Sequence, residues 1–203
     1  AGGRQNALGG ISKLVANGKG KEVIDAGAMK SVLKIMNNNL QESSLQASAC
    51  VFINMAARSP SCKASIVELA EVTDGRTCAA ISAAMRQHSN NSEVQRQGCT
   101  ALWGLANLST EMQLVLCDEG VVELLIATAQ AHPREEQVAS AAAGALLAIA
   151  KGNPNTQAMM ASKGAPGAVK KVFGNHKTIN FKGEFDDLRT WLREASRAVK
   201  AKK

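Results

Sequence analysis

Few residues in this chain have the types and spacing that catalysis or metal binding requires. The three histidines lie in or beside expected turns, at intervals of about 44 residues: His88, His132 and His176. None of them has a cysteine at the short spacing of zinc ligands. No Gly-x-Ser-x-Gly nucleophile motif occurs, and the segment 18–21 (Gly-Lys-Gly-Lys) lacks the spacing of a phosphate-binding loop. We therefore expect solvated histidines and a protein that is not an enzyme, with no catalytic residues, no cofactor and no metal site.

The cysteines also give no sign of chemistry. There are five, an odd number, and no two form a Cys-x-x-Cys pair: Cys50, Cys62, Cys78, Cys99 and Cys117. Most stand among apolar residues with helical spacing, so we expect buried, reduced thiols. Reduced thiols favour a reducing compartment inside the cell, with the cytoplasm preferred over the nucleus or an organelle. No apolar run reaches the roughly 18 residues that cross a membrane, so we expect no membrane insertion.

Charge divides the chain into two parts. Residues 1–162 contain 13 basic and 13 acidic residues, whereas residues 163–203 contain 11 basic and four acidic ones. The whole net charge of +7 therefore belongs to the last segment. Its candidate basic surface residues are Lys170, Lys171, Arg193, Arg197 and Lys200.

The elements that must position any site are helices. Residues 93–108 have a polar start followed by apolar residues at three- and four-residue steps, which predicts a long helix capped by Asn91 or Ser92. Residues 42–57 and 135–150 follow the same plan, and residues 7–16 look like the end of another long helix. Between the long helices, a short helix ends at a glycine and a second helix follows. Those glycines, which should adopt a left-handed conformation, are Gly27, Gly75, Gly120 and Gly164.

This succession resembles the armadillo repeat family. The motifs that carry the resemblance are Ala-Leu-Trp-Gly-Leu-Ala at 101–106, similar segments at 52–56 and 145–150, and Val-Ile-Asp-Ala-Gly at 23–27. The resemblance covers about residues 7–173 and implies an all-α fold. That fold would be a right-handed α-solenoid of about four three-helix repeats with a C-terminal capping helix.

The resemblance also sets expected boundaries. Residues 1–177 would form the array, and residues 178–203 a basic helix that covers its last face. Within the array we expect a partial first repeat, full repeats at about 19–57, 61–108 and 111–150, and a last partial repeat at 155–173. The segment 58–75 departs from the pattern because it is a few residues longer than its counterparts.

Armadillo repeats line a concave groove with their third helices, where the family often places a Trp and an Asn one turn apart. One register puts the Asn positions at Asn54, Gly104 and Ala148, and the Trp positions at Cys50, Thr100 and Gly144. In that register only Asn54 matches. A second register pairs Trp103 with Asn107, and the sequence leaves both open. The regular Asn ladder of nuclear-signal-binding members is absent. So is a row of basic residues, which members that capture acidic peptides would need.

Trp103 has two interpretations, packing in the core or between repeats and an exposed anchor for a partner. Arg96, Gln97, Thr100 and Asn107 would share its face of the helix. Two functional hypotheses follow. The first is a protein-interaction scaffold or structural subunit that binds an extended protein segment, or joins a larger assembly, through the groove. The second, less favoured, is nucleic-acid or anionic-surface binding through residues 163–203.

Overall fold

The computed structural model describes residues 2–69, 72, 74–151 and 153–173, and five residues nearer the C-terminus: 190, 191, 193, 194 and 197. The side chains of 170–173 lie outside that description. The described chain is all-helical and contains no strand. Its helices are α1 (Gly2–Ala16), α2 (Gly20–Asp25), α3 (Ala28–Asn38), α4 (Ser43–Arg58), α5 (Pro60–Val67), α7 (Arg76–Gln87), α8 (Ser92–Ala106), α9 (Thr110–Asp118), α10 (Val121–Ala131), α11 (Glu136–Ala150), α12 (Pro154–Ser162) and α13 (Ala165–Phe173).

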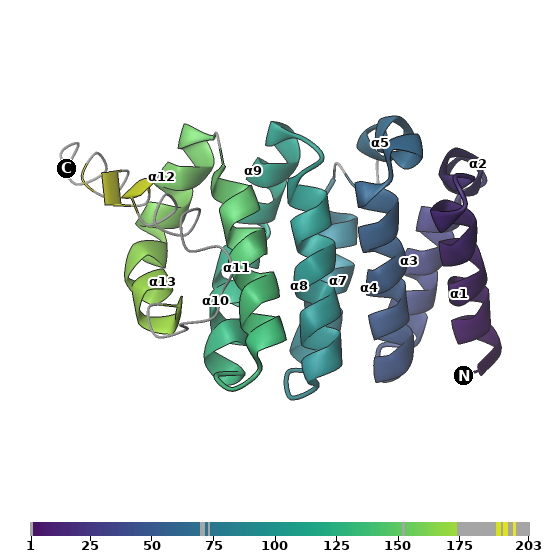
Figure 1. Cartoon of the computed structure of the whole chain (residues 1–203), viewed down its shortest axis with the longest axis horizontal. Coiled ribbons are helices and arrows are strands. Elements are labelled where there is room, and N and C mark those ends of the chain that lie inside the picture. Colours follow the sequence, from purple (N-terminus) through teal and green to yellow (C-terminus); the bar gives the residue numbers. More distant parts are fainter. Residues whose placement is uncertain are drawn as a thin grey trace.

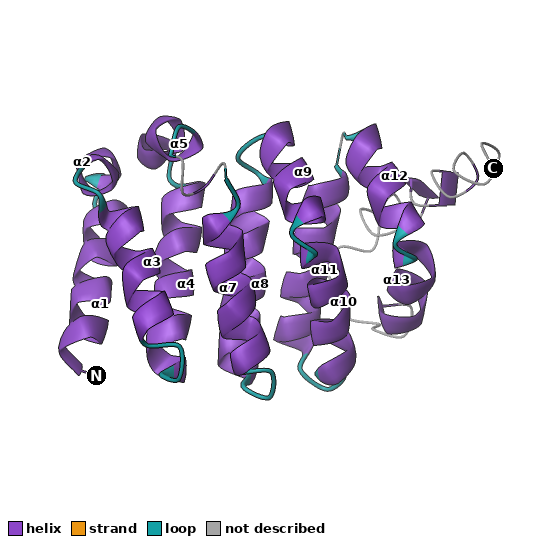
Figure 2. Cartoon of the chain, turned by 180° about the vertical axis from the view of Figure 1, so that it is seen from behind, coloured by secondary structure: helices purple, strands orange, loops and turns teal. Residues whose placement is uncertain are grey.

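The helices form rows. The long helices α1, α4, α8 and α11 lie side by side in one row, each in contact with the next (Figure 1). Behind them α3, α7, α10 and α13 form a second row, which Figure 2 shows from its own side. The short helices α2, α5, α9 and α12 lie across one end of the rows. One layer of this stack therefore consists of a short, a middle and a long helix.

The predicted glycine turns are confirmed. Gly27, Gly75, Gly120 and Gly164 have φ values of 80°, 81°, 71° and 77°, the left-handed region that side chains disfavour. The first three each precede a middle helix as its N-cap residue. The chain therefore reverses sharply from short helix to middle helix in every layer.

Two sequence-based expectations about helix limits are wrong or refined. The first long helix begins at Gly2, five residues before the segment 7–16 that the sequence indicated. The cap of α8 is Asn91, whose side chain accepts a hydrogen bond from the Val94 N–H. The longer segment 58–75 is evident as well: residues 68–75 separate α5 from α7, whereas two residues separate α2 from α3 and α9 from α10.

The histidine expectation is also wrong. His132 is buried, and its Nε2 lies 2.7 Å from the Ser89 carbonyl oxygen of the preceding layer. His88 makes the equivalent contact of 2.7 Å with the Leu40 carbonyl oxygen. Because a carbonyl oxygen only accepts, each imidazole must donate from Nε2. These two histidines link successive layers, and His176 lies outside the described residues.

The described part of residues 178–203 is helical at 190, 191, 193, 194 and 197. Trp191 is half-buried there and packs against the core. The remaining residues of the predicted capping helix lie outside the described part of the chain.

Candidate functional site

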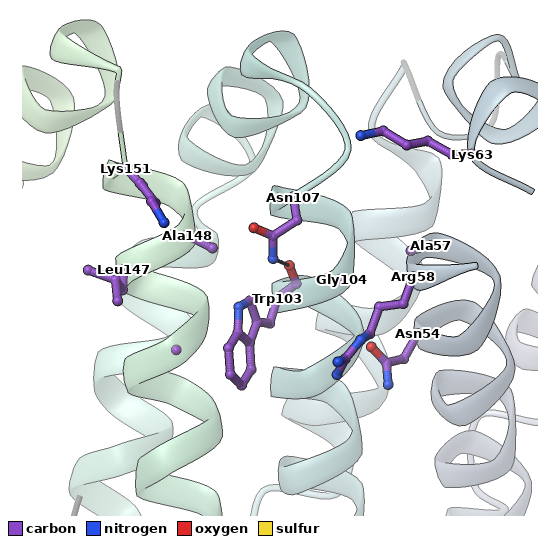
Figure 3. A pocket seen from close by; sticks show the side chains of 11 residues that line it. Asn54, Ala57, Arg58, Lys63, Trp103, Gly104, Asn107, Leu147, Ala148 and Lys151 are labelled. Carbon is purple, nitrogen blue, oxygen red and sulfur yellow. Dashed lines mark hydrogen bonds between the residues drawn. The ribbon is translucent and has the colours of Figure 1, made fainter. Parts of the chain in front are cut away.

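A hollow of about 420 Å³ lies between α4, α8 and α11, close to the end of the stack that carries the short helices. Figure 3 shows its walls, with α4 on one side, α8 in the middle and α11 on the other. We call this hollow the α8 groove. Its lining residues are Asn54, Ala57, Arg58, Lys63, Trp103, Gly104, Asn107, Gly144, Leu147, Ala148 and Lys151.

Trp103 lies in the α8 groove and also packs between layers. The side chain is half-buried, and its ring lies over Gly144 of α11. A Cβ at Gly144 would be only 2.8 Å from the ring carbons Cε3 and Cζ3. The absence of a side chain at residue 144 therefore makes the room for the indole. Trp103 therefore packs against a neighbouring long helix and is also partly exposed in the groove, so each of the two sequence-based interpretations covers part of its environment.

Asn107 follows the last turn of α8 and is exposed. Its Nδ2 donates a hydrogen bond of 2.9 Å to the carbonyl oxygen of Trp103. This bond holds the carboxamide beside the indole (Figure 3) and satisfies one of the carbonyl groups left open at the helix end. Trp103 and Asn107 are therefore fixed relative to each other by α8 itself.

Asn54 approaches from α4 on the other side. A Cβ at Gly104 would be 3.0 Å from its Oδ1, so the absence of a side chain there admits the amide. The oxygen is buried and accepts no hydrogen bond from the described residues. A buried acceptor without a partner costs about 1–3 kcal/mol, so this orientation is not explained by stability alone.

The first residues of the long helices and their burial pattern decide how α4, α8 and α11 are aligned residue by residue. Aligning the first residues of α4, α8 and α11 (Ser43, Ser92 and Glu136) makes Asn54, Trp103 and Leu147 equivalent, and all three are half-buried. Gln46 and Gln95 then also coincide, and each donates to two carbonyls at the end of the preceding middle helix.

The same alignment makes the exposed residues Arg58, Asn107 and Lys151 equivalent. The first register, which matched Asn54 to Gly104 and Ala148, is therefore displaced by one residue. Residues of both registers still line the groove, because 103, 104 and 107 share one face of α8.

The sequence shows no row of basic residues on the long helices, but the folded chain brings three cations to the α8 groove. Arg58 ends α4, Lys63 belongs to α5, and Lys151 follows α11. All three are exposed, and none forms an ion pair within the described part of the chain. Among the described residues that line the hollow, none is acidic. The missed signal was the position at the C-terminal end of the long helices α4, α8 and α11, which is basic in two of these three (Arg58 and Lys151).

Arg96, Gln97 and Thr100 do not line the groove. Arg96 Nη2 pairs with the Glu93 carboxylate at 2.8 Å, and Gln97 Nε2 donates to the same carboxylate at 2.9 Å. The hydrogen bond from Gln97, followed by the interactions with Arg96, lowers the pKa of Glu93. Thr100 Oγ1 donates to the Arg96 carbonyl oxygen. These polar groups are thus occupied within α8, although they stand on the predicted face.

The basic C-terminal residues are only partly described. Arg193 and Arg197 are exposed and helical. Lys170 and Lys171 belong to α13, but their side chains, like Lys200, lie outside the described residues.

The five cysteines are buried, as expected, and the thiols of Cys50, Cys78 and Cys117 do not have the low pKa of a reactive cysteine. Burial raises the pKa of the Cys50 and Cys78 thiols to about 12, and that of Cys117 also to about 12. Thiols with such a pKa are unreactive near neutral pH. Within the described residues no three His, Cys, Asp or Glu side chains gather as metal ligands would. The described helices also include none with the length and apolarity needed to span a membrane.

A second hollow of about 690 Å³ lies between α5 and α9 and is mostly apolar. Lys63 borders it as well as the α8 groove. Its lining includes Val67, Val72, Leu108, Met112 and Val115. The long segment 58–75 forms one of its sides, so the departure from the repeat pattern and this hollow coincide.

No protein-family profile and no curated protein sequence matches this chain. Among solved structures, the chain is similar to the crystal structure of an engineered protein. The two share 17% sequence identity, with 96% of this chain and 90% of that chain covered and a TM-score of 0.53. At this identity the likeness shows the fold alone.

Proposed function

We propose that this protein is a non-enzymatic interaction module that binds an extended segment of a partner protein in the α8 groove. The partner is either a separate protein or a neighbouring subunit of a larger assembly. The observation that carries the proposal is Trp103, whose indole lies in the groove between cations and is positioned by Gly144 and the helix end at Asn107.

The proposed function assumes a particular architecture for the helices. We take the layers of short, middle and long helix to be armadillo-like repeats in a right-handed α-solenoid, with residues 178–203 as the cap of the last face. The rows of helices and the four left-handed glycines support it. In such a solenoid the row of long helices lines the concave surface, where extended partners bind.

An aromatic side chain in a hollow is a common anchor of protein interfaces. Trp residues in such positions often lose about 2 kcal/mol or more of binding free energy when truncated to Ala. The Asn107 carboxamide beside the indole can hydrogen-bond a partner's backbone through its oxygen and through its second N–H, since one Nδ2 hydrogen is bonded to the Trp103 carbonyl oxygen. Together they provide one apolar and one polar contact.

The test is the recovery of partners on the whole protein, used as bait in native extract and read by quantitative mass spectrometry. The double variant Trp103→Ala, Asn107→Ala should lose a specific partner by a factor of about 30, corresponding to about 2 kcal/mol. The matched control is Leu14→Ala, Asn38→Ala, which removes an exposed apolar and an exposed polar side chain elsewhere. Circular dichroism confirms that each variant is folded. Unchanged recovery with the groove variant would reject the proposal.

A further inference from the structure

We infer that the partner segment for the α8 groove is acidic: an extended stretch of protein with an apolar residue between two Asp or Glu residues. The inference rests on the proposed function and adds the chemistry of the partner to it. It is carried by the charges around the groove and by the spacing of the helices that present them.

The first observation is the uncompensated charge. Arg58, Lys63 and Lys151 surround the hollow without an acidic neighbour in its lining. Some other described cations are paired, among them Lys21 with Asp25, Arg76 with Asp74 and Lys163 with Glu123. Others, such as Lys30 and Lys34, form no ion pair with the described residues, so it is the convergence of three cations on Trp103 that distinguishes the groove. Residues 1–162 are neutral as a whole, so the groove is a local positive site on a neutral body. Such a site attracts anionic groups and speeds their association.

Helix stabilisation explains only part of this arrangement. Arg58 and Lys151 stand at the C-terminal ends of α4 and α11, where a cation interacts favourably with the helix dipole. Lys63 is in the first half of α5 and has no such role. The three cations come from three elements and meet only at the groove, which matches recognition of an anion better than capping.

The second observation is spacing. Arg58 and Lys151 belong to equivalent positions on α4 and α11, with α8 and its Trp103 between them (Figure 3). Packed helices lie about 8–10 Å apart, so the axes of α4 and α11, with α8 between them, are separated by about 16–20 Å. A polyproline-type extended chain rises about 3.1 Å per residue and repeats its facing every three residues. Positions one, four and seven of such a chain would therefore face α4, α8 and α11.

The partner pattern follows directly. Carboxylates at positions one and seven would face Arg58 and Lys151, and an apolar side chain at position four would cover Trp103. The lining between the cations includes the small apolar residues Ala57 and Ala148 beside Trp103, which leaves room for the backbone of the segment. Because Trp103 is the single aromatic side chain among the described lining residues, these residues offer no stacking platform for successive bases. A protein segment therefore fits better than a nucleic acid.

The experiment is selection from a display library of random nine-residue peptides on the immobilised whole protein. The wild-type protein should enrich peptides with Asp or Glu six positions apart and an apolar residue midway. A triple variant, Arg58→Glu, Lys63→Glu, Lys151→Glu, should bind these peptides at least about 30-fold more weakly and enrich basic peptides instead. The control variant Lys30→Glu, Lys34→Glu, Arg86→Glu changes three exposed cations on α3 and α7 by the same charge and should leave the selection unchanged.

Several results would overturn the inference. They are the enrichment of neutral or basic peptides by the wild type, acidic peptides that still bind the triple variant, and no enrichment at all. A single-stranded oligonucleotide that competes as strongly as the best peptide, and is lost with the triple variant, would assign the groove to nucleic acid. Neutral peptides that are lost with Trp103→Ala would overturn the acidic partner while keeping the proposed function.

Discussion

Two positions without side chains define the surroundings of the residues that matter most in this protein. Gly144 gives the indole of Trp103 its place, and Gly104 admits the amide of Asn54. Glycine in a helix interior costs about 1 kcal/mol relative to alanine, so both positions carry a cost in helix stability. The missing side chains leave room for the Asn54 amide beside α8 and for the Trp103 ring against α11. The shape of the site is thus set by what these residues lack.

The substitution Gly144→Ala tests whether the missing side chain at residue 144 is what makes room for the Trp103 indole. The new methyl group would lie about 2.8 Å from a rigid ring, so the indole must leave its place. The gain in helix propensity offsets the cost of repacking, and we expect the free energy of unfolding to change by no more than about 2 kcal/mol. Tryptophan fluorescence in a Trp191→Phe background should shift to longer wavelength as the indole becomes exposed. The control Gln137→Ala should leave the spectrum unchanged. If Gly144→Ala also leaves it unchanged, the packing of the indole against residue 144 is contradicted.

At the scale of elements, the layers are joined by side chains that complete the ends of helices. Gln95 of α8 donates to the carbonyl oxygens of Met85 and His88 at 2.7 and 3.0 Å, and its own oxygen accepts from Thr128 of α10. Gln46 does the same for Met36 and Asn39, but its oxygen has no partner among the described residues. These buried amides fix how α4 sits against α3 and how α8 sits against α7.

Gln95→Ala should therefore destabilise the protein more than Gln46→Ala. The first change leaves three buried partners without a hydrogen bond and the second leaves two, so we expect losses of about 3 and about 2 kcal/mol in the free energy of unfolding. Urea denaturation followed by circular dichroism measures both. The exposed Gln130→Ala on α10 is the control and should change stability by less than about 0.5 kcal/mol. Equal effects at the two buried positions would show that Thr128 adds nothing.

At the scale of the whole molecule, the stack is a row of helices packed through small and sulfur-containing residues. Cys50, Cys78, Cys99 and Cys117 are all buried, and alanines fill much of α11. Small side chains let helices approach closely, which suits a row in which α4 and α8 are each covered on both sides by another long helix. The same burial makes the stability of the molecule sensitive to alkali.

The buried thiols predict that stability falls as pH rises above about 8.5, where a cysteine in an unfolded chain begins to ionise. The pKa of Cys50, Cys78 and Cys117 is raised to about 12 by burial, so the folded protein keeps protons that the unfolded chain releases. The unfolded state then binds fewer protons, and the free energy of unfolding decreases by up to about 1.4 kcal/mol per pH unit for each thiol.

Urea titrations between pH 7 and 10 measure the slope, and Cys50→Ala should make it shallower. Labelling of the native protein with iodoacetamide at pH 8 should be slow at every one of these thiols. A slope that does not change in the Cys50→Ala variant would refute the assignment.

The sequence by itself determined the helices, the glycine turns and the buried cysteines. These depend on local spacing: apolar residues at three- and four-residue steps make a helix, and a glycine at its end takes the left-handed conformation. It also identified Trp103, Asn54 and Asn107 as the residues to watch, and the structure brings all three to one hollow.

Only the tertiary structure decided how the long helices are aligned and which charges meet. Aligning the motifs in the sequence matched Asn54 with Gly104, whereas the helix starts and burial match it with Trp103, because the segments between long helices differ in length. Lys151 is far from Arg58 and Lys63 in the chain, and it lines the same hollow only because α4 and α11 pack on either side of α8. His88 and His132, expected in solvent, find carbonyl oxygens of the preceding layer for the same reason. These contacts between layers join residues that are 48 and 43 positions apart in the chain, so they depend on how the helices pack and not on the local sequence.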